Sequence, residues 1–218
     1  MQLGLNQMHF RDAPATYGIA ILTVAVSVCA ILFVAPDVAA VTGGFIPGRV
    51  PDVPIANYAG WLVPVWLTPL SATLLHGGWM HLFFNMVMLV YCGREAERAL
   101  GSVSVAALYV IGAYAAAAGQ WAQDPGAVMP MIGASGAISA LVAAYAMLYG
   151  GSRTPGVGPL PAGLIHALWL GVAWTGINLL IGFTTMMGQP VAIGAHIGGF
   201  IVGLILARPL LLWRYRKA

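Results

Sequence analysis

Ser135 is the residue whose type and setting first suggest chemistry. It lies in Gly133-Ala134-Ser135-Gly136, where a loop that contains a proline gives way to an apolar run long enough for a helix. The first N–H groups of a helix have no partner within it and carry the positive end of its dipole, so negative charge that develops near Ser135 would find donors. Taken alone, the tetrapeptide is more typical of tight packing or capping of a membrane helix. The case for chemistry therefore depends on the other polar residues.

Imidazole and carboxamide side chains occur near the start of two other apolar runs. One run contains His76, His81 and Asn85, and the other opens with Gly194-Ala195-His196. His81 and Asn85 are four residues apart and would share one face of a helix, whereas His76 precedes His81 by five residues and would point elsewhere. Polar side chains within a bilayer usually face a bundle interior or a water-filled cavity. We expect these groups to meet Ser135, with His76 anchoring the first loop by a hydrogen bond in preference to a catalytic role.

A serine and a histidine on different helices suit nucleophilic catalysis. A serine hydroxyl is a weak nucleophile until an adjacent base takes its proton, and His196 is the natural base. Gly199 and Gly203 follow it with the spacing of a small-residue seam, which would let this helix approach the one that begins with Ser135. The acidic side chains all fall in terminal or loop segments, so we predict a Ser–His dyad without a carboxylate. These acidic residues are Asp12, Asp37, Asp52, Glu95, Glu97 and Asp124.

The other groups of the cluster could donate hydrogen bonds or bind a metal. His81, Asn85 and the backbone N–H of Ser135 could stabilise an oxyanion, and each such donor typically lowers the barrier by about 3 kcal/mol. A zinc site from His76, His81 and His196 is the competing interpretation. The chain has no His-Glu-x-x-His pattern and no acid at membrane depth to complete such a site. We therefore predict no metal and no cofactor.

The composition is that of a multi-pass membrane protein. Of the 218 residues, 60% are hydrophobic and 7% are charged, and the mean hydropathy is +0.87, whereas about a quarter of the residues of soluble domains are charged. The two cysteines fall in or beside apolar runs, which favours buried thiols over a disulfide. The formal charge of +3 comes mostly from Arg214, Arg216 and Lys217. It suits a partner surface of anionic membrane lipid better than a nucleic acid.

Six segments meet the requirement of about 20 apolar residues for a bilayer-spanning helix. We predict an all-α membrane protein, a six transmembrane helix bundle in a single membrane domain of residues 1–218. Residues 36–73 would form an outer loop whose aromatic side chains favour the membrane interface. The first segment lacks an obvious signal-peptide cleavage site, so we expect it to remain as a helix. The spans expected are residues 16–35, 74–92, 103–121, 133–149, 162–183 and 192–212.

The positions of the cations predict the orientation. With a cytoplasmic N-terminus, eight of the nine Lys and Arg residues lie on the inner side and only Arg49 lies outside, as the positive-inside rule requires. Six crossings return the C-terminus to the cytoplasm. The second, fourth and sixth helices then run inward, so His81, Ser135 and His196 would share one shallow depth below the outer surface.

Together these motifs resemble those of the rhomboid intramembrane serine proteases, in their six-helix bacterial type. The resemblance extends over residues 70–207 and includes Ala195-His196-Ile197-Gly198-Gly199 with Gly203. It implies a bundle of rhomboid type in which Ser135 attacks a peptide bond in or near a transmembrane segment of a protein substrate, with His196 as general base and then acid. His81 and Asn85 would line the oxyanion hole. The residues that would support the site structurally are His76, Gly133, Gly136 and Gly199.

The resemblance also implies a location and a route for substrate. The protein would lie in a bacterial inner membrane with its site open to the outer side, and substrates would enter between the second and fifth helices. Thr184 to Pro190, which joins the fifth and sixth helices, would be either a movable lid or a simple hydrophobic connector. Glu97 and Gly101 match an acid and a glycine that close the second helix in relatives, where their role would be structural.

Two features depart from the family's pattern. Leu67-Thr68 stands where many relatives carry Trp-Arg in the first loop. Ser139 stands four residues after the nucleophile, where some members place a tyrosine that stacks on the base. His196 would therefore be oriented by another group, either Ser139 itself or a neighbouring aromatic ring.

Two other functions compete with the predicted endopeptidase. One is a catalytically silent relative that binds transmembrane helices and controls their trafficking, and the presence of both Ser135 and His196 argues against it. The other is a small transporter that uses the polar cluster as a pathway. It would lack the charged residues near the membrane midplane that coupled transport usually requires.

Overall fold

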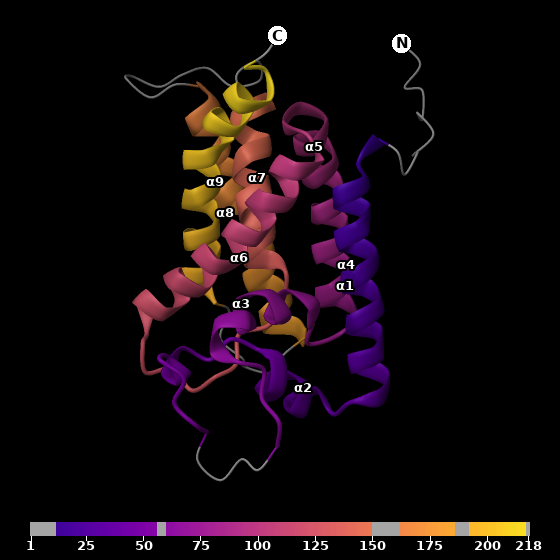
Figure 1. Cartoon of the computed structure of the whole chain (residues 1–218), viewed down its shortest axis with the longest axis vertical. Coiled ribbons are helices and arrows are strands. Elements are labelled where there is room, and N and C mark those ends of the chain that lie inside the picture. Colours follow the sequence, from indigo (N-terminus) through magenta and orange to yellow (C-terminus); the bar gives the residue numbers. More distant parts are fainter. Residues whose placement is uncertain (1–11, 56–59, 150–161, 186–191, 217–218) are drawn as a thin grey trace.

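The apolar segments form helices that run together as a bundle. In this computed structural model, residues 12–55, 60–149, 162–185 and 192–216 are described, with the backbone alone for residues 177, 178 and 180–185. Within these ranges the protein is all-α, and its β pairing is limited to one bridge between Phe45 and Met131. The first helix (Pro14–Phe33) starts and the last helix (Ile193–Arg214) finishes at the same end of the bundle (Figure 1).

Helical structure covers each of the six segments expected to be apolar helices. The long elements are α1 (Pro14–Phe33), α4 (Trp79–Met88) with its continuation, α6 (Ser102–Gln123), α7 (Ser135–Tyr149), α8 (Ala162–Thr185) and α9 (Ile193–Arg214). The first loop adds short elements at the opposite end from the termini, namely α2 (Pro36–Gly43), η2 (Pro47–Arg49), η3 (Val65–Leu67), α3 (Thr68–Ser71) and η4 (Ala72–Leu74).

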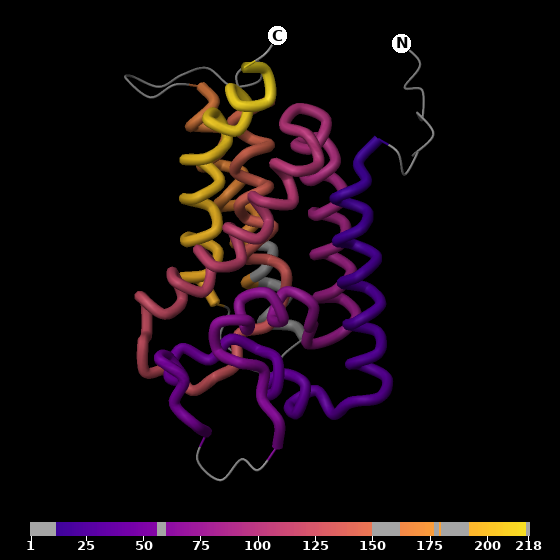
Figure 2. Tube along the Cα trace, in the orientation of Figure 1, coloured from indigo at the N-terminus to yellow at the C-terminus, as the bar shows by residue number. Residues whose placement is uncertain are grey.

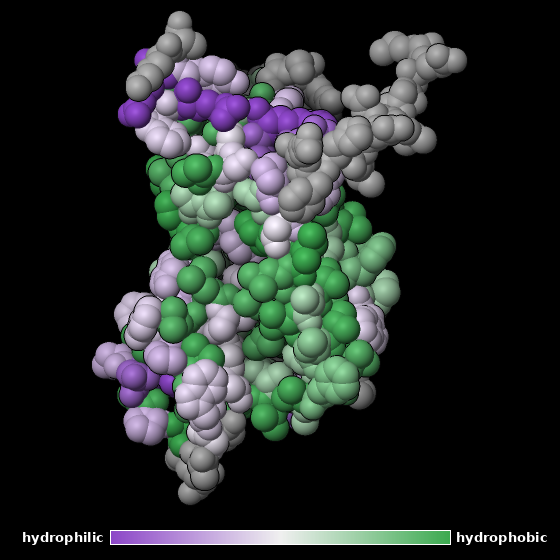
Figure 3. Space-filling view, turned by 45° about the vertical axis from the view of Figure 1, so that its right-hand side comes forward, coloured by the Kyte–Doolittle hydropathy of each residue, from purple (hydrophilic) through white to green (hydrophobic). Residues whose placement is uncertain are grey.

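Several helices have the length and composition of membrane spans. α1, α6 and α9 each meet the requirement alone, and a fourth span results if the bent pair Val65–Leu74 and Trp79–Leu100 is counted as one. α7 and residues Ala162–Gly176 are shorter apolar helices. On the face drawn in Figure 3, hydrophobic residues form a broad band across the middle, and hydrophilic residues gather at the end that carries the termini. The chain is an integral membrane protein.

The second apolar helix begins and ends later than the expected range of residues 74–92. α4 starts at Trp79 and continues through a π-helical turn, η5 (Leu89–Gly93), into α5 (Arg94–Leu100). The helix axis turns by 91° at the break before Trp79, where Gly78 has a φ of +156° that side-chain-bearing residues rarely adopt. The expected start is wrong because hydropathy registers apolar residues on both sides of this turn and does not detect the turn itself.

α7 lies at the centre of the bundle. Every residue from Gly136 to Ala146 is buried, and α7 contacts α4, α6, α8 and α9. In the trace of Figure 2 it runs between α9 on one side and α4 on the other. A helix that is apolar all round is stable where neighbours cover it on every side. The helix that begins with Ser135 is therefore the one against which the others pack.

Glycines let α9 approach its two neighbours closely. A Cβ atom added at Gly199 would collide with the carbonyl oxygen of Gly136, and one at Gly203 would collide with that of Ala140. These residues belong to the seam predicted between the fourth and sixth helices, and a larger side chain there would require a backbone to move. α9 approaches α6 equally closely, with Gly194 against Gly119 and Gly198 against Ala115.

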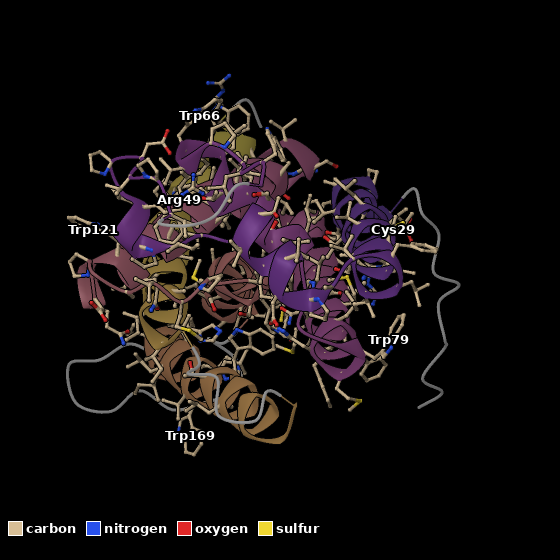
Figure 4. All side chains as sticks on the ribbon, turned by 90° about the horizontal axis from the view of Figure 1, so that it is seen from below. Cys29, Arg49, Trp66, Trp79, Trp121 and Trp169 are labelled. Carbon is tan, nitrogen blue, oxygen red and sulfur yellow. The ribbon has the colours of Figure 1, made fainter. Side chains whose placement is uncertain are left out.

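The first loop is joined to the segment that precedes α7. Phe45 and Met131 exchange backbone hydrogen bonds of 3.0 and 2.7 Å, so the loop is fixed close to the start of the central helix. Seen from this end of the bundle, exposed tryptophans project outward around its perimeter (Figure 4). Aromatic rings at such positions favour a membrane interface. These residues are Trp66, Trp79 and Trp121.

Glu97 ties α5 to the start of α1. Its carboxylate accepts hydrogen bonds from the backbone N–H of Ala15 at 2.9 Å, from that of Thr16 at 2.8 Å and from the Thr16 hydroxyl at 2.6 Å. Ala13, the N-cap residue of α1, offers no side-chain acceptor, so Glu97 performs the capping that Ser or Asp usually performs. The carboxylate also faces the positive end of the α1 dipole. Its role in the fold is to hold the first helix against the end of the second.

Replacing this carboxylate should destabilise the protein. In Glu97→Gln, one of the two oxygens becomes an NH₂ group that faces an N–H or O–H donor of α1 in either orientation of the amide, and the loss of charge-assisted hydrogen bonds should cost about 2–3 kcal/mol. Thermal unfolding of the purified protein in detergent would show a lower midpoint. Glu95→Gln is the matched control, because Glu95 forms partly exposed ion pairs with Arg94 and Arg98, which contribute little. Equal midpoints for the two variants would contradict the anchoring role.

Candidate active site

Ser135 and His196 are in direct contact. The distance between Ser135 Oγ and His196 Nε2 is 2.9 Å, which joins the first residue of α7 to the first turn of α9. His196 is 3% exposed, whereas Ser135 is half-buried. A serine hydroxyl that touches an imidazole has a general base within hydrogen-bonding reach. The close crossing of α7 and α9 is what brings the two side chains together.

The turn before Ser135 is held from both sides. The N–H of Gly133 donates to the carbonyl of Ala72 at 2.9 Å, and the N–H of Ala134 donates to Nε2 of His76 at 3.4 Å. Gly133 has a φ of +114°, and a Cβ atom there would lie 2.7 Å from Cε1 and Nε2 of His81. Glycine is therefore required here by its backbone conformation and by the nearby ring.

His81 presents a ring N–H to this turn. The backbone N–H of Gly77 donates to His81 Nδ1 at 3.4 Å, so in a neutral ring the proton is carried by Nε2. Nε2 is one of the ring atoms that lie against Gly133. His81 thus places a hydrogen-bond donor beside Gly133, which precedes Ser135 by two residues in the chain.

His76 joins three segments of the chain. The hydroxyl of Ser27 on α1 donates to the carbonyl of Leu74 at 2.7 Å, so its single proton is already used. The 2.8 Å contact between Ser27 Oγ and His76 Nδ1 must then be donated by the ring, which leaves Nε2 to accept from Ala134. His76 also meets the ring of His81 edge-on, with 4.9 Å between centroids. It therefore connects α1, the first loop and the turn before α7.

Asn85 lies one turn after His81 on the same face of α4. Its amide nitrogen donates to the carbonyl of His81 at 2.8 Å, and the residue is 1% exposed. Among the residues that the structure describes, no donor reaches Asn85 Oδ1. The second N–H of the amide is left for a further acceptor.

Trp174 on α8 belongs to the site although its position in the sequence does not single it out. Its ring meets the ring of His196 edge-on, with 6.5 Å between centroids and 73° between planes. The indole N–H donates to Ser139 Oγ at 3.0 Å, and the Ser139 hydroxyl donates to the carbonyl of Ser135 at 2.7 Å. In the described part of the chain, His196 Nδ1 has no hydrogen-bond partner. Contact with Trp174 is thus one of the interactions that fix the imidazole ring.

The arrangement offers a nucleophile, a base and hydrogen-bond donors. Over the residues that the structure covers, no group of three or more His, Cys, Asp or Glu side chains could hold a metal ion. The connector expected at Thr184 to Pro190 lies outside the described residues from position 186 onward, and α8 ends at Thr185.

The fold and the site define a helical membrane protein with a Ser–His pair, half-buried at the serine, where two helices cross. Residues 64–213 match the rhomboid domain, and the chain belongs to the rhomboid family. Similar proteins are named rhomboid protease GlpG. The one from Pectobacterium atrosepticum is 31% identical over 137 residues, which cover 63% of this chain and 46% of that protein.

Two further relatives carry the same name. The protein from Yersinia pestis is 28% identical over 163 residues, covering 72% of this chain and 54% of its own length. That from Serratia proteamaculans is 32% identical over 140 residues, covering 63% and 45%. The chain therefore spans about half the length of the curated relatives that it matches.

Widening the seam between α7 and α9 should destabilise the bundle. In Gly199→Ala, the new methyl group would collide with the Gly136 carbonyl, and relieving such overpacking typically costs about 1–3 kcal/mol. Gly18→Ala is the matched control, because no atom lies within 4 Å of a Cβ added at Gly18 on α1. Thermal unfolding in detergent should show a lower midpoint for Gly199→Ala alone. A midpoint equal to that of the unmodified protein would contradict the close packing.

Proposed function

We propose that this protein is an intramembrane serine endopeptidase that hydrolyses peptide bonds in or near the transmembrane segments of membrane proteins. The observation that carries the proposal is the 2.9 Å contact between Ser135 Oγ and His196 Nε2. The names of its relatives, all rhomboid proteases, support the same activity.

The reaction proceeds in two stages through a dyad. Ser135 Oγ attacks the carbonyl carbon of the substrate peptide while His196 Nε2 takes the hydroxyl proton. The imidazolium then gives this proton to the leaving nitrogen, the C–N bond breaks, and an acyl group remains on Ser135. A water molecule, deprotonated by the same ring nitrogen, attacks the ester and releases the carboxylic acid and the free hydroxyl. The first stage requires His196 to carry its single proton on Nδ1.

Three donors would stabilise the negative oxygen of each tetrahedral intermediate. They are the Nε2–H of His81, the free amide N–H of Asn85 and the backbone N–H of Ser135 at the start of α7. The tautomer of His81 supports its role, because the hydrogen bond from Gly77 leaves the proton on the nitrogen that lies against Gly133. The dipole of α7 adds to the same effect. His76, Gly133, Gly136 and Gly199 support this arrangement structurally.

Trp174 and Ser139 would hold the His196 ring in its orientation towards Ser135. No carboxylate bonds to His196 Nδ1 among the described residues, so the orientation of the ring depends on packing. The indole of Trp174 is itself fixed by its hydrogen bond to Ser139, which is bonded to the Ser135 carbonyl. These two side chains therefore link the base on α9 to the backbone of the nucleophile on α7. Trp174 is a positioning residue in this scheme.

We infer a topology of six spans in one membrane domain over residues 1–218, with both termini in the cytoplasm. The start of α1 and the end of α9 lie at the same end of the bundle (Figure 1), which supports an even number of crossings, and the number of cations in the segments at that end agrees with a cytoplasmic side. The outward-facing tryptophans at the opposite end support an interface there (Figure 4). The active site would then open to the outer side of a bacterial inner membrane, where membrane lipid surrounds the protein and transmembrane proteins are its substrates. No cofactor or metal takes part.

The alternative is a catalytically silent relative that binds transmembrane helices. It would retain the bundle without needing a serine hydroxyl in contact with an imidazole. The two functions differ in whether Ser135 reacts with an electrophile.

Ser135 should react with a fluorophosphonate probe. We expect covalent labelling of the unmodified protein and none of Ser135→Ala, because the probe's phosphorus accepts the serine oxygen in place of a peptide carbonyl. Cleavage of a tagged model transmembrane segment should fall on the order of 10⁴-fold or more in both Ser135→Ala and His196→Ala, since members of such a unit act together. Asn85→Ala should lose roughly a hundredfold. Equal labelling of Ser135→Ala and the unmodified protein would remove Ser135 from the nucleophile role.

Trp174→Leu should slow the reaction of each active site without reducing the number of sites. Removing the ring frees the imidazole to rotate, and misplacement of a catalytic group typically costs roughly ten- to a hundredfold in rate. Trp174→Phe removes the hydrogen bond between Trp174 and Ser139 and should lose about fivefold. Ser139→Ala removes this bond and the one to the Ser135 carbonyl, so it should lose at least as much, and the double variant should lose no more than Ser139→Ala. The rate constant and the stoichiometry of fluorophosphonate labelling separate these effects.

Trp169→Leu is the matched control for this experiment. Trp169 lies on the same helix, is 69% exposed and points away from the bundle (Figure 4). Its replacement should leave both the rate constant and the stoichiometry unchanged. A Trp174→Leu protein with fewer reactive sites but an unchanged rate constant per site would show that Trp174 serves stability only.

A further inference from the structure

A cavity opens at the end of the bundle that carries both termini, far from Ser135. It has a volume of about 490 Å³ and lies between the start of α6 and the end of α9. Residues 100–104 form one wall, and Trp213, Arg214 and Arg216 form the other. No step of the proposed reaction uses this cavity.

The arginines of the cavity are not neutralised by acids. Within the described residues, neither Arg214 nor Arg216 forms an ion pair. The guanidinium carbon of Arg214 lies 5.9 Å from the ring centroid of Tyr215, and that of Arg216 lies 5.4 Å from the ring centroid of Trp213. A guanidinium stacked on an aromatic ring keeps its N–H edge available, and this edge matches the oxygens of a phosphate group.

The opposite wall is the positive end of a long helix. α6 has 22 residues, its first turn contains no acidic residue, and its N-cap residue, Gly101, offers no side chain to the first N–H groups. The Arg214 side chain lies directly against Gly101, so a cation adjoins the positive end of a helix dipole. An anion between them would be attracted by both.

Ser104 gives an independent indication of a ligand. It lines the cavity, is 1% exposed, and its hydroxyl has no hydrogen-bond partner in the described part of the chain. A buried hydroxyl without a partner is unfavourable. An anionic oxygen bound in the cavity would accept the missing hydrogen bond.

We propose that this cavity binds the phosphate group of an anionic glycerophospholipid. The cations, the helix start and the Ser104 hydroxyl would recognise a phosphate from any source. The apolar surroundings favour a lipid, because Val103 in the wall and Leu212 beside it are 72% and 64% exposed and would contact acyl chains. The binding does not depend on peptidase activity, so it can be tested in a protein that does not cleave.

The test uses the full chain in a neutral detergent, with lipid binding followed by native mass spectrometry. Phosphatidylglycerol should bind more tightly than phosphatidylcholine, which carries no net charge. Arg214→Gln should weaken phosphatidylglycerol binding about tenfold, the typical cost of losing a charge-assisted hydrogen bond. Ser104→Ala leaves the charge of the cavity unchanged and should weaken phosphatidylglycerol binding by about fivefold. Arg208→Gln, at an exposed arginine earlier on α9, is the charge-matched control and should change it less than twofold.

Four results would overturn the proposal. Equal affinity of the unmodified protein for both lipids would show that the cavity does not recognise the anion. Equal weakening in Arg214→Gln and Arg208→Gln would show attraction to net charge alone. Displacement of phosphatidylglycerol by inorganic phosphate at matched concentration would assign the site to free phosphate. If Arg214→Gln lowers the thermal midpoint, its weaker binding could come from unfolding. An unchanged affinity of Ser104→Ala for phosphatidylglycerol would then still contradict the site.

Discussion

The close approach of α9 to α7 is the constraint on which the rest of the structure depends. Carbonyl oxygens of α7 occupy the space that side chains would take at Gly199 and Gly203. A bilayer provides no hydrophobic drive for helices to associate, so contact between small residues and the fit of the surfaces hold such helices together. With the backbones this close, a serine at the start of one helix and a histidine in the first turn of the other meet at hydrogen-bonding distance.

Around this crossing, several polar groups have hydrogen bonds whose direction is set by their neighbours. The proton of Ser27 goes to the Leu74 carbonyl, so His76 must donate to Ser27 and accept from Ala134. The hydroxyl of Ser139 donates to the Ser135 carbonyl and so accepts from Trp174. In an apolar interior, a donor that does not reach an acceptor costs free energy. The hydrogen bonds within the cluster therefore also fix which ring nitrogens of His76 and His81 carry a proton.

The two polar ends of the molecule differ in the charge of their functional side chains. At the end near Ser135, neutral groups are arranged so that a reaction could develop charge among oriented donors. At the end that carries the termini, permanent charges gather, and one of them, Glu97, is fully used as the cap of α1. The arginines of α9 have no acidic partner of this kind within the described residues, so an anionic lipid of the membrane would supply their counter-charge. The apolar band between the two ends keeps them apart (Figure 3).

The sequence indicates Ser135, His196, His81 and Asn85 as candidates because a polar residue within an apolar run is conspicuous, and because spacing by four residues defines a helix face. The apolar runs are recognisable by their length, because a helix needs about 20 apolar residues to cross a bilayer. Sequence could not reveal the 91° turn before Trp79, since hydropathy is blind to backbone direction, nor which tryptophan would meet His196. Trp174 and the unpaired arginines gain their roles only when helices distant in the chain pack together. The sequence by itself determines which side chains each helix carries and on which face they lie. Which of these side chains come into contact is decided by the tertiary structure, because glycine packed against backbone sets how closely the helices approach.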